Sequence, residues 1–188
     1  MKLQVLENRL IFDGAFGADV ILDLGISNKG FIDPSDTIAF DEQIATSRNE
    51  IAVIDTAIND YQTLATNVPH NIDVIYIDGT QDGLVQLETQ LANYNDIDAL
   101  HIFGHGAAGT IQLGSATLDN TTIEGYASEL TALGQKLTGA GDILFYNCDV
   151  AADATGEMLI AEIGKLTTAD IAASNDITGS AELSGDWD

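Results

Sequence analysis

The chain has 188 residues, and 45% of them are hydrophobic, which is enough apolar material for a folded core. Thirty acidic residues outnumber six lysines and arginines, giving a formal net charge of −24. Because nucleic acids and anionic membrane surfaces are bound through clustered basic side chains, this charge argues against both as partners. No run approaches the roughly 18 uninterrupted apolar residues of a membrane span, so we expect no membrane insertion.

The first 50 residues are rich in glycine and aspartate, with only short apolar stretches between them. We interpret residues 1–50 as a leader with little core of its own, which limited proteolysis should remove before Glu50. No apolar secretory signal follows Met1, so an export signal, if the protein is exported, lies elsewhere.

The single cysteine excludes an internal disulfide, which fits an intracellular protein and equally an exported bacterial protein. Most of the acidic residues are aspartates. This bias is typical of secreted proteins that fold in calcium or salt, and a merely solubilising surface explains it equally well.

Residues 51–188 alternate between predicted strands and helices, and a glycine-bounded stretch at 110–114 predicts a small hairpin. Strands alternating with helices predict an α/β domain, a three-layer sandwich whose mainly parallel sheet is covered on both faces. Strands are expected at 51–54, 74–77, 99–104, 143–146 and 171–173. Helices are expected at 61–67, 84–94, 123–137 and 158–166, the last capped by Asp153 or Thr155.

Two reactive side chains follow predicted strands. His105 comes directly after the strand at 99–104, and Cys148 comes after the run 142–147. In an open parallel sheet functional residues gather beyond the carboxyl ends of the strands, so a thiol and an imidazole would share one crevice. That pair is the minimum for a cysteine nucleophile with a general base. The alternatives are an inert core cysteine and a histidine that only occupies a tight Gly-His-Gly turn.

The neighbours of this pair modify the hypothesis. His101 is expected on the same strand face as His105, packing in the sheet and supporting it. A third metal ligand is not apparent, so we predict neither a metal nor another cofactor. The backbone N–H groups of Gly106 and Cys148 are placed to polarise a carbonyl. A helix that begins after Cys148 favours a thiolate, whereas the adjacent Asp149 disfavours it.

The order of these two motifs resembles the cysteine peptidase clan of caspases, gingipains, clostripain and legumain. The resemblance covers residues 100–106 and 143–148. It implies a caspase–hemoglobinase fold, with His105 as the base and Cys148 as the nucleophile. The backbone amides of Gly106 and Cys148 would donate the oxyanion hydrogen bonds.

The same resemblance implies a specificity pocket formed by Ser174, Asn175 and Asp176. With Asp149 nearby and no basic residue in these segments, arginine, lysine or a small neutral residue is expected before the scissile bond. The alternative is that these acids are only solvated surface. Asn147 departs from the clan pattern, in which Ala or Gly is common before the cysteine.

A more extensive resemblance covers residues 51–188 and is to an uncharacterised domain near the N-terminus of giant bacterial surface and repeat adhesins. The leader at 6–15 is similar to the Leu-Glu-Pro-Arg-type segment that often precedes that domain, with Asn8 where proline is usual. The runs that carry this resemblance lie at 54–56, 82–84, 101–106, 112–114, 172–179 and 185–187. It implies a very large exported protein at the cell surface, type I secretion and calcium-dependent (RTX) repeats further along the chain.

Together these patterns predict a caspase-like cysteine endopeptidase domain that processes its own downstream polypeptide or a neighbouring one. A fused peptidase would meet its substrate at high effective concentration. The alternative is a non-catalytic module that keeps the fold and serves secretion, retention or assembly of an adhesin. The Cys–His pair favours the enzyme, and His105 and Cys148 are then expected on adjacent strand ends, facing one cleft.

Overall fold

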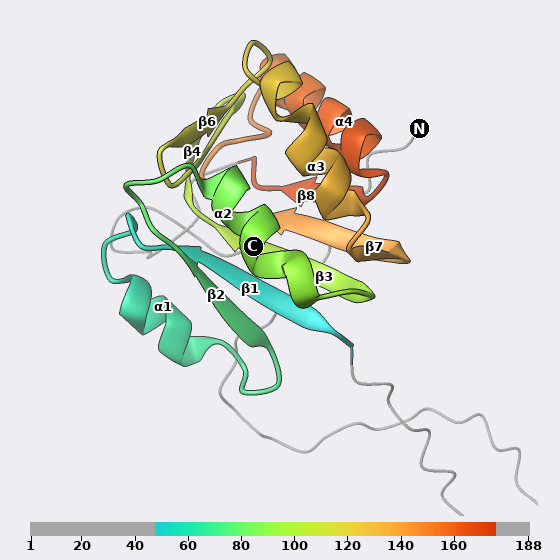
Figure 1. The fold of residues 1–188 in the computed structure, drawn as a ribbon. Coiled ribbons are helices and arrows are strands. Elements are labelled where there is room, and N and C mark those ends of the chain that lie inside the picture. Colours follow the sequence, from blue (N-terminus) through green and yellow to red (C-terminus); the bar gives the residue numbers. More distant parts are fainter. Residues whose placement is uncertain (1–47, 176–188) are drawn as a thin grey trace, which may run out of the picture. The chain divides into compact units, whose positions relative to one another are not determined.

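The computed structural model describes residues 48–175, which form an α/β domain around a five-stranded parallel sheet (Figure 1). The strand order is β2-β1-β3-β7-β8, and each neighbouring pair runs parallel. These strands are β1 (Glu50–Asp55), β2 (Asp73–Ile77), β3 (Ile97–Phe103), β7 (Leu137–Phe145) and β8 (Asp170–Ala173). A small antiparallel sheet consists of β4 (His105–Ala107), β5 (Thr110–Leu113) and β6 (Ala116–Leu118). The helices are α1 (Tyr61–Asn67), α2 (Gly83–Gln90), α3 (Ala127–Gly134) and α4 (Ala154–Thr167), with 3-10 turns at η1 (Leu91–Asn93) and η2 (Ile123–Tyr126).

Helices cover both faces of the large sheet, as Figure 1 shows. The larger apolar cluster joins α2, α3 and α4 to one face, together with buried side chains of the small sheet. The smaller cluster joins α1 to the opposite face of β1, β2 and β3. Since β1 and β3 are buried on both faces, their sequences are almost unbroken apolar runs rather than alternating ones. The predicted α/β three-layer sandwich with a parallel sheet is confirmed.

The path of the chain creates a switch point between β1 and β3. From β1 the chain passes through α1 to β2 on one side, and then returns through α2 to β3 on the other side of β1. At such a point the connections leave the two strands in opposite directions and open a crevice beyond their carboxyl ends. The segments at this switch point are residues 56–58 after β1 and residues 104–107 after β3.

Several sequence-based boundaries differ from the structure. The helix predicted at 123–137 divides into η2 and α3 and ends at Gly134, because Leu137 pairs with Ile97 and begins β7. The hairpin predicted at 110–114 is part of a three-stranded sheet, since the residues after Gly104 pair with β5. The helix predicted at 158–166 begins earlier, at Ala154, and the predicted cap by Asp153 is confirmed, because its side chain accepts from the N–H groups of Thr155 and Gly156.

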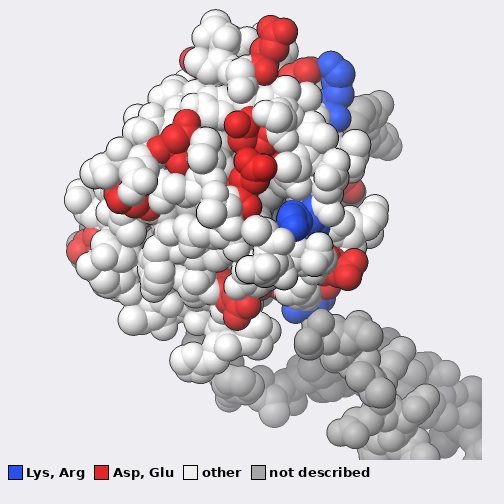
Figure 2. Space-filling model, in the orientation of Figure 1, with Lys and Arg blue, Asp and Glu red and all other residues white. Residues whose placement is uncertain are grey.

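Acidic side chains are spread over the face of the domain drawn in Figure 2, with few basic side chains among them. None of the helices in residues 48–175 is long and apolar enough to cross a membrane. The leader up to residue 47, the predicted pocket residue Asp176 and the run at 185–187 lie outside the described residues.

Candidate functional site at the carboxyl ends of the strands

The structure brings the predicted thiol and imidazole to adjacent strand ends. Ile102 of β3 is the partner of Phe145 in β7, and the N–H of Tyr146 donates to the Ile102 carbonyl oxygen at 2.8 Å. The two chains therefore leave the sheet side by side. His105 follows β3 after one residue, and Cys148 lies a few residues beyond β7.

The backbones around these two residues are in direct contact. The side-chain Nδ2 of Asn147 donates a 2.8 Å hydrogen bond to the carbonyl oxygen of His105. A Cβ atom placed on Gly106 would lie 2.8 Å from the Cys148 carbonyl oxygen and 2.8 Å from the Asn147 Cβ. Only glycine allows an approach this close, so residue 106 lets one strand end lie against the other. The His105 side chain is exposed and Cys148 is partly buried.

The imidazole of His105 also touches the loop after β1. Its Nε2 lies 3.4 Å from the carbonyl oxygen of Ala57. A carbonyl oxygen only accepts, so this contact requires the hydrogen on Nε2 and leaves the lone pair on Nδ1. His105 therefore lies at the switch point, between the loop after β1 and the loop after β7.

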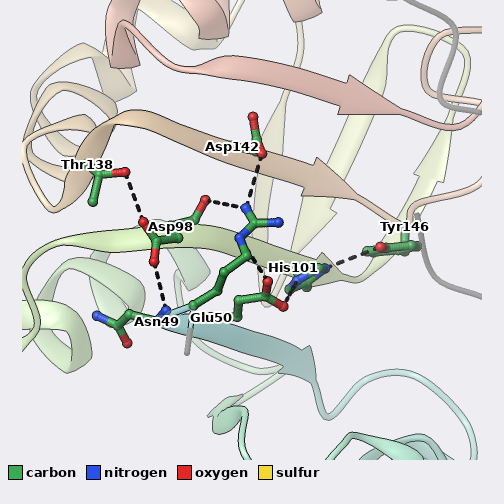
Figure 3. Close-up of polar contacts among 8 residues, drawn as sticks. Asn49, Glu50, Asp98, His101, Thr138, Asp142 and Tyr146 are labelled. Carbon is green, nitrogen blue, oxygen red and sulfur yellow. Dashed lines mark hydrogen bonds and ion pairs between the residues drawn. The ribbon is translucent and has the colours of Figure 1, made fainter. Parts of the chain in front are cut away.

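His101 occupies a separate, buried network, drawn in Figure 3. Its Nδ1 lies 3.2 Å from the Tyr146 hydroxyl, and its Nε2 lies 3.3 Å from a carboxylate oxygen of Glu50. Because the carboxylate can only accept, Nε2 carries the hydrogen and the tyrosine hydroxyl donates to Nδ1. His101 packs in the sheet as expected. The expectation that it shares a face with His105 and supports it is wrong, because β3 ends at Phe103 and His105 belongs to another sheet.

Burial sets the protonation of this network. Removal from water lowers the pKa of His101, and the hydrogen bond and charge of Glu50 oppose this only in part. Burial, with a contribution from Glu50, raises the pKa of Tyr146 to about 12. The Tyr146 ring also stacks on Phe103 with centroids 4.5 Å apart. Both groups are therefore neutral at pH 7 and act as structural hydrogen-bond partners.

The network continues to the amino edge of the sheet. Arg48 contacts a Glu50 carboxylate oxygen at 3.2 Å, an Asp142 carboxylate oxygen at 3.5 Å and the Asp98 carbonyl oxygen at 3.1 Å. The Asp98 side chain accepts from the Asn49 N–H at 2.9 Å (Figure 3). This edge ties the first described residues to β3 and β7, and it lies at the opposite end of the strands from Cys148.

The remaining sequence-predicted site residues lie in the same strand-end region as far as the structure describes them. Asp149 directly follows Cys148 and adopts a left-handed backbone conformation with φ of 58°, which Asp tolerates better than most residues. The Ser174 carbonyl accepts from the Ala151 N–H at 2.8 Å, so the end of β8 meets the loop after Cys148. Asn175 is exposed.

Sequence analysis missed Asp55, the buried polar residue at the end of β1. Its side chain is 1% exposed, and its oxygens accept from the N–H groups of Ala57 and Gly114. The sequence carried part of this signal, because Asp55 is a polar residue at the end of an apolar run. The same position, at the end of an apolar run, pointed to His105 and Cys148. Across residues 48–175 no group of three His, Cys, Asp or Glu side chains is arranged to hold a metal ion.

The geometry defines an α/β domain with His105 and Cys148 on adjacent strand ends at the carboxyl edge of a parallel sheet. A family model described as a domain of unknown function, DUF4347, matches residues 51–188, and the chain belongs to this family. No curated protein and no solved structure matches the chain.

Proposed function

We propose that this domain is a caspase-like cysteine endopeptidase, with Cys148 as the nucleophile and His105 as the general base. The observation that carries the proposal is the contact between the two strand ends, in which Gly106 lies against the Cys148 carbonyl oxygen and the Tyr146 N–H donates to the Ile102 carbonyl oxygen. The parallel sheet with a switch point between β1 and β3 supports it, because that is where such sheets bind ligands.

The proposed chemistry uses only groups at this edge. The Cys148 sulfur attacks a peptide carbonyl carbon, and its proton passes to Nδ1 of His105, the nitrogen that the Ala57 contact leaves unprotonated. The C–N bond then breaks, and the imidazolium returns the proton to the leaving amine. Water hydrolyses the thioester, one proton passing through His105 back to sulfur. In this scheme the Gly106 and Cys148 backbone amides stabilise the oxyanion.

The proposed substrate is a polypeptide, and the first candidate is the chain to which the domain is fused. The proposed setting is an exported bacterial surface protein secreted by a type I pathway, and the resemblance to the N-terminal domain of giant adhesins supports it. A tethered substrate is present at an effective concentration in the millimolar range or below, so a weak intrinsic affinity suffices. Auto-processing is therefore the reaction that the proposal expects first.

Thiol labelling tests the proposal on the native chain. A peptidyl chloromethyl ketone should alkylate Cys148, and mass spectrometry locates the adduct. Because a positioned base contributes about 10²–10⁴-fold, His105→Ala should slow the alkylation by about 100-fold or more. His70→Ala is the matched control, since His70 is an exposed histidine remote in sequence from both strand ends, and it should label at the wild-type rate. Equal rates for wild type and His105→Ala would refute the base.

One observation favours a second candidate, a non-catalytic module for secretion, retention or assembly of an adhesin. Asn147 is fully buried and its amide group binds the His105 carbonyl, where the peptidase clan commonly has Ala or Gly. A buried hydrogen bond of this kind stabilises the fold and is compatible with a domain that has no catalytic activity. In that case Cys148 would resist the electrophile in the native domain and react only after unfolding.

A further inference from the structure

Asp55 is a buried carboxylate that joins two separate segments at the carboxyl edge of the sheet. Its Oδ1 accepts from the Ala57 N–H at 2.8 Å, and its Oδ2 accepts from the Gly114 N–H at 2.7 Å. The side chain is 1% exposed. Burying a carboxylate costs free energy even when it is hydrogen-bonded, and an apolar residue would fill a strand end at lower cost. We therefore expect Asp55 to have a role other than packing.

Both segments held by Asp55 contact His105. The carbonyl oxygen of Ala57 lies 3.4 Å from the His105 Nε2. Gly114 comes two residues after Gln112, the residue that pairs with His105 between β4 and β5. One carboxylate thus fixes both the loop whose carbonyl oxygen contacts the imidazole and the end of the strand that pairs with the His105 backbone, through bonds to residues 2 and 59 positions away in the sequence.

We propose that Asp55 is a positioning residue for His105, acting through the Ala57 carbonyl and the β5 strand. This inference rests on the proposed function, since it assigns Asp55 a task in the same Cys–His chemistry. Hydrogen bonds to a charged acceptor are shorter and stronger than neutral ones, so the two amides are held firmly. A base that is misplaced by about 1 Å can lose on the order of 100-fold in rate, so a second layer that holds it matters.

Asp98 provides the matched control. It is also a carboxylate that ties a segment next to β1 to the sheet, accepting from the Asn49 N–H at 2.9 Å and the Thr138 hydroxyl at 3.3 Å. Asp98 lies at the amino edge, so it shares the type of contact with Asp55 but not the neighbourhood of His105. Asp55→Asn keeps the shape of the side chain and turns one acceptor into an NH₂ group, which releases one of the two amides.

The test is a double-mutant cycle on the rate of Cys148 alkylation by the peptidyl chloromethyl ketone, in the full chain. Asp55→Asn should slow alkylation by roughly 10-fold or more, and adding His105→Ala to it should then slow alkylation far less than in the wild type. Asp98→Asn should leave the full effect of His105→Ala in place. A merely structural loosening would make Cys148 more accessible and would not remove the dependence on His105.

The outcomes separate this inference from the function it rests on. If native Cys148 does not react, or reacts equally without His105, the proposed function fails and the role of Asp55 fails with it. If labelling depends on His105 equally in wild type and Asp55→Asn, the role of Asp55 alone is overturned. If circular dichroism shows that Asp55→Asn does not fold, Ala57→Gly replaces it, since Ala57 is exposed and glycine loosens the same backbone. An unchanged His105 effect in Ala57→Gly would then overturn the role.

Discussion

The side-chain amide of Asn147 binds the carbonyl oxygen of His105 at 2.8 Å and lies 3.4 Å from the carbonyl oxygen of Gln112. Both partners are acceptors, so the orientation of the amide is fixed, with Nδ2 toward them and Oδ1 away. In residues 48–175, Oδ1 of Asn147 is the buried side-chain polar atom without a hydrogen-bond partner. One residue from the loop after β7 thus locks the chain after β3 and strand β5 together.

Removing this lock should destabilise the domain. We expect Asn147→Ala to lower the free energy of unfolding by about 1–2 kcal/mol, because two carbonyls lose a buried donor while the unpartnered Oδ1 is also removed. Asn147→Asp should cost more, since a carboxylate would face the same two carbonyl oxygens. Urea unfolding followed by circular dichroism measures both. Asn120→Ala is the control, because the exposed Asn120 makes the same kind of bond to the Thr155 carbonyl at 2.9 Å. Equal losses at positions 147 and 120 would contradict the lock.

The parallel sheet could be predicted because each strand can be recognised from its local sequence pattern. β1 and β3 are apolar on both faces, and the stretches between strands carry helical spacing, so a doubly covered sheet follows from pattern alone. The placement of His105 and Cys148 on neighbouring strand ends followed from the same pattern. Leu137 shows the limit, because its helical spacing is overridden by pairing with Ile97, which no local pattern contains.

The partners of the site residues could not be predicted because they are distant in the sequence. Asp55 binds Gly114 across 59 positions, and His101 binds Glu50 across 51. Single-sequence periodicity reports which face a residue occupies and not which residue lies opposite. The break at Gly104 also mattered, since it ends the alternation that would have placed His101 and His105 on one face.

His101 should make the domain less stable at mildly acidic pH. Burial lowers its pKa below the ordinary 6.5, so the unfolded chain binds a proton more readily than the folded domain does. Stability is therefore full above about pH 6.5 and is lost as the pH falls from there through the lowered pKa. The free energy of unfolding should be smaller at pH 5.5 than at pH 7.5.

Two histidine variants separate this effect from the titration of other groups. His101→Gln keeps polar atoms for Tyr146 and Glu50 but does not titrate, so its difference between pH 7.5 and 5.5 should shrink. His70→Gln removes an exposed histidine and should keep the wild-type difference. An undiminished pH dependence in His101→Gln would show that other groups cause the acid sensitivity.

Arg48 should contribute modestly to stability in spite of its three contacts. Its side chain is 46% exposed, and exposed ion pairs are worth roughly 0–1 kcal/mol. Because Arg48 joins Glu50, Asp142 and the Asp98 carbonyl, we place Arg48→Ala near the top of this range, at about 1 kcal/mol. Lys165→Ala, which removes a single pair with Glu162 on α4, should cost less. Thermal unfolding at low and high salt checks this, and equal costs for both variants would contradict a network.

The last prediction concerns substrate preference, and the distribution of charge around Cys148 decides it. Among residues 48–175 the basic side chains besides histidine are Arg48, Lys136 and Lys165. Arg48 precedes β1, Lys136 precedes β7, and Lys165 lies in the last turn of α4, next to the start of β8. All three belong to the amino edge of the sheet. The nine residues of β7 span roughly 30 Å at about 3.3 Å per residue, so Lys136 is far from Cys148.

At the carboxyl edge, by contrast, Asp149 follows Cys148 directly and Asp153 caps α4 just beyond it. A site with carboxylates and without a basic side chain pairs well with a positive charge and repels a negative one. We therefore expect cleavage after arginine, lysine or a small neutral residue and not after aspartate, as measured with a peptide library. Asp149→Asn should reduce the preference for a basic residue, while Asp119→Asn, in the loop after β6, should not. Preferred cleavage after aspartate would overturn this prediction, and identical profiles for wild type and Cys148→Ala would show that the cleavage does not come from this domain.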